Sequence, residues 1–357
     1  MKLKNLLLLF LLISSYNLIA SDIKINDGSS NFSVTNKTVS EFSFINSVSD
    51  FSTVIVNTAE GQFVKLVIPG YDSDSKNGDA ELPVLKKIIR VPFGSDIAVK
   101  IINLEEKTIK LSDYGFNMKI FPNQPSVSKS AINIPFYCNQ EYYSLDTFIR
   151  NDIVKTKLLG KMRGQQLARL SVSPFSYNPT SNELRIVTKI EVRVVFKNND
   201  INADRENRKK YYSSEFESLF RTFVNYTPII EKDVITTYPV KYVIVSDPAF
   251  QSALQPLVDW KKKKGFFVVE EYTSNPLVGN TTNSIHTFIK DMYDNATPSN
   301  PAPTYLLLVG DLAQVPSFNN GNHVSDMYYC EFDGNGDFYP EMYYGRFSAT
   351  SAAEVES

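Results

Sequence analysis

Short apolar runs separated by clusters of turn-forming residues fill the chain from about residue 31 to residue 196. Examples are the runs at 63–68, 97–102 and 184–196. In the last run, apolar residues alternate with charged ones, a period typical of a strand with one buried face. The polar stretch 178–182 precedes it and supplies a turn, so we expect a β-hairpin there. The pattern predicts an all-β, sandwich-like domain over residues 21–197.

A polar run interrupts this pattern at residues 198–210. Such a run has little apolar surface with which to offset the entropy lost when a chain is ordered. Residues 211–224 follow with aromatic and apolar residues at mixed spacing, which is compatible with a helix. We therefore predict a linker over residues 198–225.

The period changes after residue 240, where short apolar strands alternate with amphipathic helices. Strands are expected at 242–245, 266–269 and 305–309, and helices at 247–264 and around 285–292. Asp247 and Pro248 form a good helix start, and Gly265 a good helix end. The order predicts an α/β domain with a mainly parallel sheet covered on both faces. Ligands bind such sheets at the carboxyl ends of the strands, where Asp311 would lie.

The first twenty residues have the pattern of a secretory signal peptide. Lys2 and Lys4 precede the apolar run 6–13, and the segment closes on Ala20. No later stretch approaches the ~18 consecutive apolar residues that a membrane-spanning helix needs. Residues 1–20 therefore predict export, a secreted or cell-surface location and no membrane span.

Charge and cysteine content narrow the possible partners. The 357 residues carry a formal net charge of −2, without a sustained basic face, so nucleic acid is not expected as a partner. The two cysteines, Cys138 and Cys330, are too few for a disulfide framework or a zinc site. We expect two separate, buried thiols, and a single Cys138–Cys330 bridge in an oxidising compartment is the alternative.

A glycine-rich acidic loop carries the most informative local chemistry. Asp333, Asn335, Asp337 and Glu341 place side-chain oxygens at odd positions of the segment. Hard cations such as calcium take six to eight oxygen ligands, and a loop with glycines can fold around one centre. An ordinary β-turn is the alternative, because Asp, Asn and Gly are also the usual turn formers.

Four segments in the second half of the chain resemble the gingipain family of bacterial cysteine endopeptidases. They are the Tyr-Thr-Pro sequence at 226–228, Leu-Val-Asp-Trp-Lys at 257–261 with Gly265, the strand sequence 305–311, and 339–342 running into Gly-Arg-Phe-Ser at 345–348. Their order and spacing carry the resemblance. The upstream β region, especially 78–94 and the final hairpin, is similar to the gingipain propeptide.

This resemblance implies a zymogen layout. Residues 226–357 would be the N-terminal, truncated part of a caspase-like catalytic domain that acts on protein or peptide substrates. The domain at 21–197 would be a propeptide covering it, with processing in the region 198–225. The catalytic His and Cys of the family would follow residue 357, so no catalytic residue is expected in this chain. Pairing of His323 with Cys330 is the alternative.

The resemblance also implies a structural calcium ion. Its expected ligands are the carboxylates of Asp311, Asp337 and Glu341 and the backbone oxygen of Tyr339. Phe332 and Asp333 are the candidates for a further ligand. A different class of function stays open beside the zymogen, namely a non-catalytic secreted binding or surface module built on the same two domains.

Overall fold

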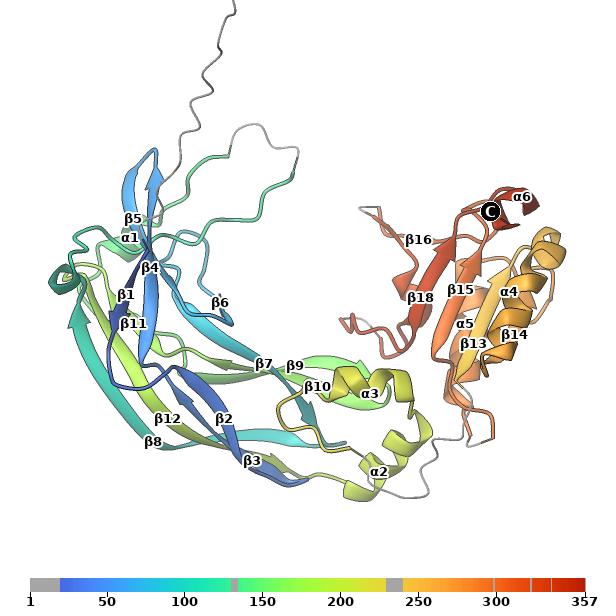
Figure 1. Cartoon of the computed structure of the whole chain (residues 1–357), viewed down its shortest axis with the longest axis horizontal. Coiled ribbons are helices and arrows are strands. Elements are labelled where there is room, and N and C mark those ends of the chain that lie inside the picture. Colours follow the sequence, from blue (N-terminus) through green and yellow to red (C-terminus); the bar gives the residue numbers. More distant parts are fainter. Residues whose placement is uncertain are drawn as a thin grey trace, which may run out of the picture.

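A computed structural model describes residues 20–129, 134–228, 240–297, 299–321, 323–334 and 336–356. The predicted signal peptide, apart from its last residue, and Asn335 of the acidic loop lie outside the described residues. The chain forms an elongated β-rich part and a smaller α/β part, with two helices between them at one side (Figure 1). Three described helices of one short turn complete the fold: η1 (Leu111–Tyr114), α1 (Gln140–Tyr143) and η3 (Met327–Cys330).

Antiparallel sheets build the β-rich part, which confirms the all-β prediction. The first sheet has the order β1-β4-β5: β1 (Ala20–Lys24), β4 (Asp50–Thr58) and β5 (Gly61–Val67). The second has the order β6-β7-β10-β9: β6 (Tyr71–Ser73), β7 (Pro83–Val91), β10 (Gln165–Val172) and β9 (Val154–Met162). The third has the order β11-β12-β3-β2: β11 (Phe175–Asn178), β12 (Glu183–Lys197), β3 (Glu41–Ser47) and β2 (Asn31–Lys37). Strand β8 (Asp96–Lys110) pairs with the other edge of β12.

Strand β12 shows how the alternating pattern produces this packing. Ile190, Val192 and Val194 are fully buried, whereas the charged residues between them face outward. Their buried face packs against Phe42 and Phe44 of β3 in one core cluster. The predicted hairpin is also present, because β11 pairs antiparallel with β12 across the turn.

The polar run that we predicted as a linker forms helix α2 (Ile201–Lys210), followed by α3 (Ser214–Phe220). Asp204 of α2 is buried and pairs with the equally buried Arg90 of β7. The carboxylate also accepts the backbone N–H of Phe93 at 3.0 Å. The polar composition of residues 198–210 did not indicate a helix. The buried Arg90–Asp204 ion pair holds α2 against β7, although the helix has little apolar surface to bury.

Residues after α3 also pack on the β-rich part. The Asn225 side chain accepts the backbone N–H of Arg90 and donates to its carbonyl, both at 2.8 Å, as a neighbouring strand would. Tyr226 is buried in a cluster that joins α3 to Met162 and Leu167 of the β9–β10 hairpin. The described chain is therefore held against the β-rich part up to Tyr226.

The α/β part is a parallel sheet with the order β14-β13-β15-β18, as predicted. Its strands are β13 (Lys241–Ser246), β14 (Phe267–Tyr272), β15 (Tyr305–Val309) and β18 (Tyr343–Phe347). The described helices around it are η2 (Pro248–Phe250), α4 (Gln251–Lys263), α5 (Thr282–Asp294) and α6 (Ala352–Glu356). A small pair of strands, β16 (Phe318–Asn319) and β17 (Val324–Ser325), lies outside the main sheet.

Alternate residues of the central strands pack against helices on opposite faces. Val243 and Leu306 contact the cluster that contains Ile285 and Ile289 of α5. Ile244 and Leu307 belong to the cluster of Leu254 and Val258 of α4. This three-layer arrangement explains why the strands are continuous apolar runs.

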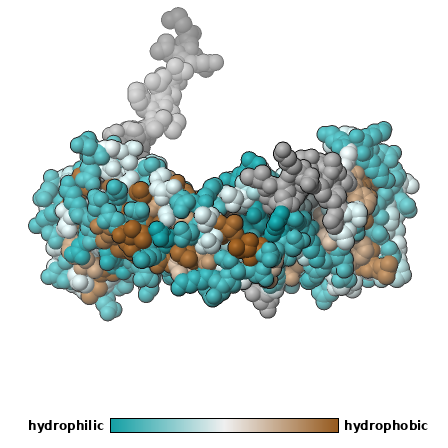
Figure 2. Space-filling view, turned by 90° about the horizontal axis from the view of Figure 1, so that it is seen from below, coloured by the Kyte–Doolittle hydropathy of each residue, from teal (hydrophilic) through white to brown (hydrophobic). Residues whose placement is uncertain are grey.

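The hydrophilic surface is interrupted by several hydrophobic patches on the face shown in Figure 2.

Both cysteines are free. Cys330 is fully buried as expected, but Cys138 is only partly buried, which corrects that half of the prediction. No helix in the part of the chain that the structure describes is long and apolar enough to cross a membrane.

The Arg90–Asp204 pair generates a stability prediction. Asp204→Ala leaves a buried guanidinium without its partner, so we expect the free energy of unfolding of the β-rich part to fall by about 3–5 kcal/mol. Urea unfolding followed by circular dichroism measures this change. Glu206→Ala on the exposed side of the same helix is the control and should change it by less than about 0.5 kcal/mol. Equal losses in both variants would contradict the role of the ion pair.

Candidate functional site: an acidic loop held by a β-hairpin

The carboxyl edge of the parallel sheet is one place where a site was expected. β13 ends at Ser246 and β15 ends at Val309, so Asp247 and Asp311 follow neighbouring strands at this edge. The Asp311 backbone N–H donates to Ala349 O at 2.9 Å, and its carbonyl accepts the N–H groups of Gln314 and Val315. Asp311 thus begins a tight turn at the predicted edge.

Arg346 holds the loops above this edge. Its guanidinium forms an ion pair with Asp326 at 2.7 Å and donates to the carbonyls of Gly310, Val315 and Pro316. The side chains of both ion-pair partners are largely buried. In the sequence, Arg346 was noted only as part of the segment 345–348 that resembles the family. Its role in holding these loops was not predicted, because most of its acceptors are backbone carbonyls.

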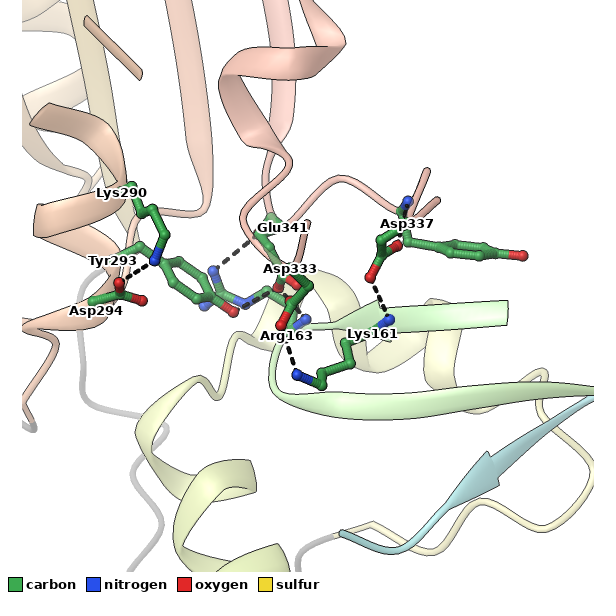
Figure 3. A network of polar contacts seen from close by, with 9 residues as sticks. Lys161, Arg163, Lys290, Tyr293, Asp294, Asp333, Asp337 and Glu341 are labelled. Carbon is green, nitrogen blue, oxygen red and sulfur yellow. Dashed lines mark hydrogen bonds and ion pairs between the residues drawn. The ribbon is translucent and has the colours of Figure 1, made fainter. Parts of the chain in front are cut away.

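A second site lies at the opposite, amino edge of the sheet, where the β9–β10 hairpin of the β-rich part meets the loop 331–341 (Figure 3). The hairpin turns at Arg163 and Gly164, both with positive φ values, of 52° and 68°. A Cβ at Gly164 would collide with the Tyr211 ring, so only glycine permits this close approach. The tight turn pushes the Arg163 side chain into the α/β part.

Arg163 is 1% exposed. Its guanidinium donates to four backbone carbonyls, those of Tyr211, Tyr212, Pro303 and Glu341, at 2.5–3.3 Å. The rings of Phe216 and Tyr293 each lie 5.4 Å from the guanidinium carbon, within the range of cation–π attraction. A buried guanidinium is tolerated because its donors are distributed over these acceptors.

Three acidic side chains of the loop, those of Asp333, Asp337 and Glu341, contact the hairpin. Asp337 Oδ2 accepts the backbone N–H of Lys161 at 2.7 Å, and Asp333 pairs with the Lys161 ammonium at 2.7 Å. Glu341 Oε2 accepts the backbone N–H of Arg163 and the hydroxyl of Tyr293, the latter at 2.5 Å. Burial raises the pKa of Glu341 to about 8, although Tyr293 and Arg163 act in the opposite direction.

The remaining predicted residues have other surroundings. Tyr339 donates its backbone N–H to Asp337 Oδ1 at 3.0 Å, and the Phe332 ring packs on Tyr293. His323 is bonded to Asn320 and Tyr328 at 3.3 Å each. Burial raises the pKa of the Cys330 thiol well above its ordinary value, whereas a nucleophile needs a lowered one. The surroundings of Cys330 therefore suit a core residue.

The calcium prediction can be compared with this arrangement. The donor set is chemically suitable, since it consists of carboxylates, and Glu341 Oε1 is buried without a hydrogen-bond partner. The other carboxylate oxygens of Asp337 and Glu341 already face N–H and O–H donors, and Asp311 lies at the other edge of the sheet. Among the described residues, no group of three or more His, Cys, Asp or Glu could hold a metal ion. With the hairpin docked, the loop does not fit the ion.

Family models of known proteins match both the part of the chain that contains the hairpin and the part that contains the acidic loop. Residues 30–246, which include the hairpin, match the family model described as Propeptide_C25. Residues 235–357, which include the acidic loop, match Peptidase family C25. Lys-gingipain of Porphyromonas gingivalis is 32% identical over 347 residues, covering 94% of this chain and 20% of the relative. Gingipain R2 of the same organism is 28% identical, covering 79% of this chain and 37% of the relative.

Solved structures of the same group are also similar. A gingipain K structure from P. gingivalis, concerned with zymogenic latency, is 30% identical, covers 50% of this chain and 98% of its own, and has a TM-score of 0.48. The complex of P. gingivalis RgpB pro- and mature domains is 20% identical, covers 55% and 98%, and has a TM-score of 0.45. The chain spans about a fifth of the length of the Lys-gingipains that it matches. The two family matches show that the chain belongs to the C25, or gingipain, family and carries a propeptide followed by peptidase sequence.

Proposed function

We propose that the chain is the N-terminal portion of a secreted cysteine endopeptidase zymogen that hydrolyses protein or peptide substrates. The observation that carries this proposal is the order of the two family matches along one chain, propeptide first and peptidase second. The Lys-gingipain relatives, similar along 94% of this chain, support the same activity for the full-length protein. Export by residues 1–20 and a caspase-like arrangement of the parallel sheet are parts of this proposal.

The chemistry of such an enzyme requires a thiolate and an imidazole. The thiolate attacks the peptide carbonyl, and the imidazole first accepts the proton and then returns it to the leaving amine. Both histidines and both cysteines of residues 1–357 have described positions, and no described contact joins a cysteine to a histidine. We therefore assign the catalytic pair to the remainder of the full-length protein.

In this proposal the β-rich part has the role of a propeptide bound to its own peptidase. The docked hairpin supports the role, because it contributes a fully buried cation and two backbone donors to the peptidase part. If the two parts separated only partly, the Arg163 guanidinium would stay buried without all of its acceptors, which raises the free energy of that intermediate state. The two parts should therefore dock and separate in a single step. The contact lies at the amino edge of the sheet, opposite the carboxyl edge where Asp311 follows β15.

Activity is the first test. The full-length precursor, once processed, should cleave unstructured casein, and a thiol-alkylating reagent should abolish the cleavage. Cys330→Ala in that precursor should retain the thiol-sensitive activity, because Cys330 is a buried core residue. Residues 1–357 alone should be inactive. Thiol-sensitive cleavage by residues 1–357 that disappears in Cys330→Ala would instead assign catalysis to the His323–Cys330 pair, and an inactive precursor would favour the binding module.

Docking is the second test. Arg163→Ala removes the cation from four carbonyls and Glu341, so the docked arrangement should lose about 3–5 kcal/mol. The unfolding midpoint of the peptidase part should then fall by roughly 6 to 20 °C in differential scanning calorimetry. Lys157→Ala, an exposed change on the same strand, is the matched control and should leave the midpoint within about 2 °C. An unchanged midpoint in Arg163→Ala would show that the hairpin does not hold the two parts together.

A further inference from the structure

Residues 224–228 run along an edge of the β-rich part that its strands leave open. Strand β6 pairs only with the first three residues of β7, so in the described part of the chain the rest of that edge has no partner strand. Val224 donates its backbone N–H to Ile88 O at 3.2 Å. The Asn225 side-chain amide pairs with both backbone groups of Arg90. The segment thus satisfies backbone groups that an edge strand would otherwise leave exposed.

Side chains from three further elements hold the same segment. Lys37, at the end of β2, donates to the Tyr226 carbonyl at 3.1 Å. Arg208 of α2 donates to Thr227 O at 2.6 Å, and its guanidinium carbon lies 5.3 Å from the centre of the Tyr226 ring. The hydroxyl of the buried Tyr226 donates to Glu217 of α3 at 2.7 Å. These three elements and β7 all belong to the chain before the segment.

The backbone that leads into the segment is also occupied. The N–H groups of Arg221, Thr222 and Phe223 donate to carbonyls of α3 at 3.0 Å each, and that of Tyr226 donates to Phe223 O at 3.1 Å. The Arg221 side chain is 64% exposed, so a trypsin-like protease could reach it. Cutting the next bond, however, requires several consecutive residues to leave their partners, so cleavage depends on local opening of the fold.

The two family matches divide the chain in agreement with these contacts. Residues 224–228 lie within the propeptide match at 30–246 and before the peptidase match, which starts at residue 235. The Tyr-Thr-Pro sequence at 226–228 resembles the opening of a gingipain catalytic domain, so the sequence predicted processing before it. Contacts and family matches instead group these three residues with the propeptide.

We propose that residues 224–228 are a clasp of the propeptide, which closes the open edge of β7, stays with the propeptide when the peptidase is released, and shields the bonds from Arg221 to Pro228 from the activating cut. The peptidase then begins beyond Pro228 and not at Tyr226. The inference rests on the proposed zymogen function only in assuming that a cut releases the peptidase. The clasp itself is a property of residues 1–357 and can be tested without peptidase activity.

Trypsin digestion of residues 1–357 under native conditions, followed by mass spectrometry, is the first test. The Arg221–Thr222 bond should resist trypsin in the unmodified chain. Arg208→Ala removes two contacts of the clasp, so cleavage at this bond should become at least about tenfold faster, because a hydrogen bond from a charged group shifts the local opening equilibrium by that much. Lys37→Ala, at an exposed position, should also accelerate it and serves as the second variant if Arg208→Ala does not fold.

Lys210→Ala is the matched control, because Lys210 is an exposed basic residue of the same helix without a described contact to residues 224–228. It should leave the rate of cleavage after Arg221 unchanged. The bond after Arg193, within β12, should resist trypsin in every variant that folds. Rapid cleavage after Arg221 in the unmodified chain would overturn the proposal, and so would equal rates in the unmodified chain and both clasp variants.

The processed full-length precursor supplies the second test. Mass spectrometry of the released propeptide should find residues 224–228 at its carboxyl end, and the amino-terminal sequence of the peptidase should begin beyond Pro228. A peptidase that begins at any residue from 222 to 228 would contradict the clasp even if the enzyme is active. An inactive precursor would contradict the proposed function, and the trypsin rates would then decide the clasp alone.

Discussion

The buried guanidinium of Arg163 is the interaction on which the arrangement of the whole chain depends. Its acceptors come from three separate segments, the carbonyls after α2, the carbonyl before β15 and the carbonyl before β18. A charge fully removed from water persists only where such acceptors are fixed in advance. One side chain thereby joins the propeptide hairpin, the helical segment α2–α3 and the amino edge of the peptidase sheet.

An aromatic row reinforces this edge. Tyr242, Tyr305 and Tyr343 occupy the same level of β13, β15 and β18, and their neighbouring rings lie 5.5–5.6 Å apart. The row continues through Phe216 of α3, whose ring stacks on Tyr343 at 4.4 Å and lies 5.4 Å from the guanidinium carbon of Arg163. The segment α2–α3 is thus packed between the two parts, which explains why it is ordered despite its polar start.

Regular elements could be predicted from the sequence, and long-range polar contacts could not. Strand β15 has the predicted bounds, and helix α5 was predicted from its apolar stripe. Both predictions succeeded because the spacing of apolar residues along a short segment indicates which of its faces is buried. Helix α2 was missed because Asp204 finds its partner 114 residues away. Arg163 was missed for a related reason, since backbone carbonyls, its main acceptors, have no signature in the sequence. The acidic loop was predicted as a calcium site, with an ordinary turn as the alternative, and the sequence did not reveal the propeptide's own hairpin as its partner.

The segment 224–226, docked on β7, also fixes how far the two parts can separate while the chain is intact. The connection then runs only from Pro228 to Val240, about twelve steps, or at most ~40 Å when fully extended. A short tether of this kind keeps the hairpin at an effective concentration in the millimolar range around the acidic loop. Docking can therefore be complete even if the isolated parts have only micromolar affinity, and a single cut in the tether would make propeptide release depend on dilution.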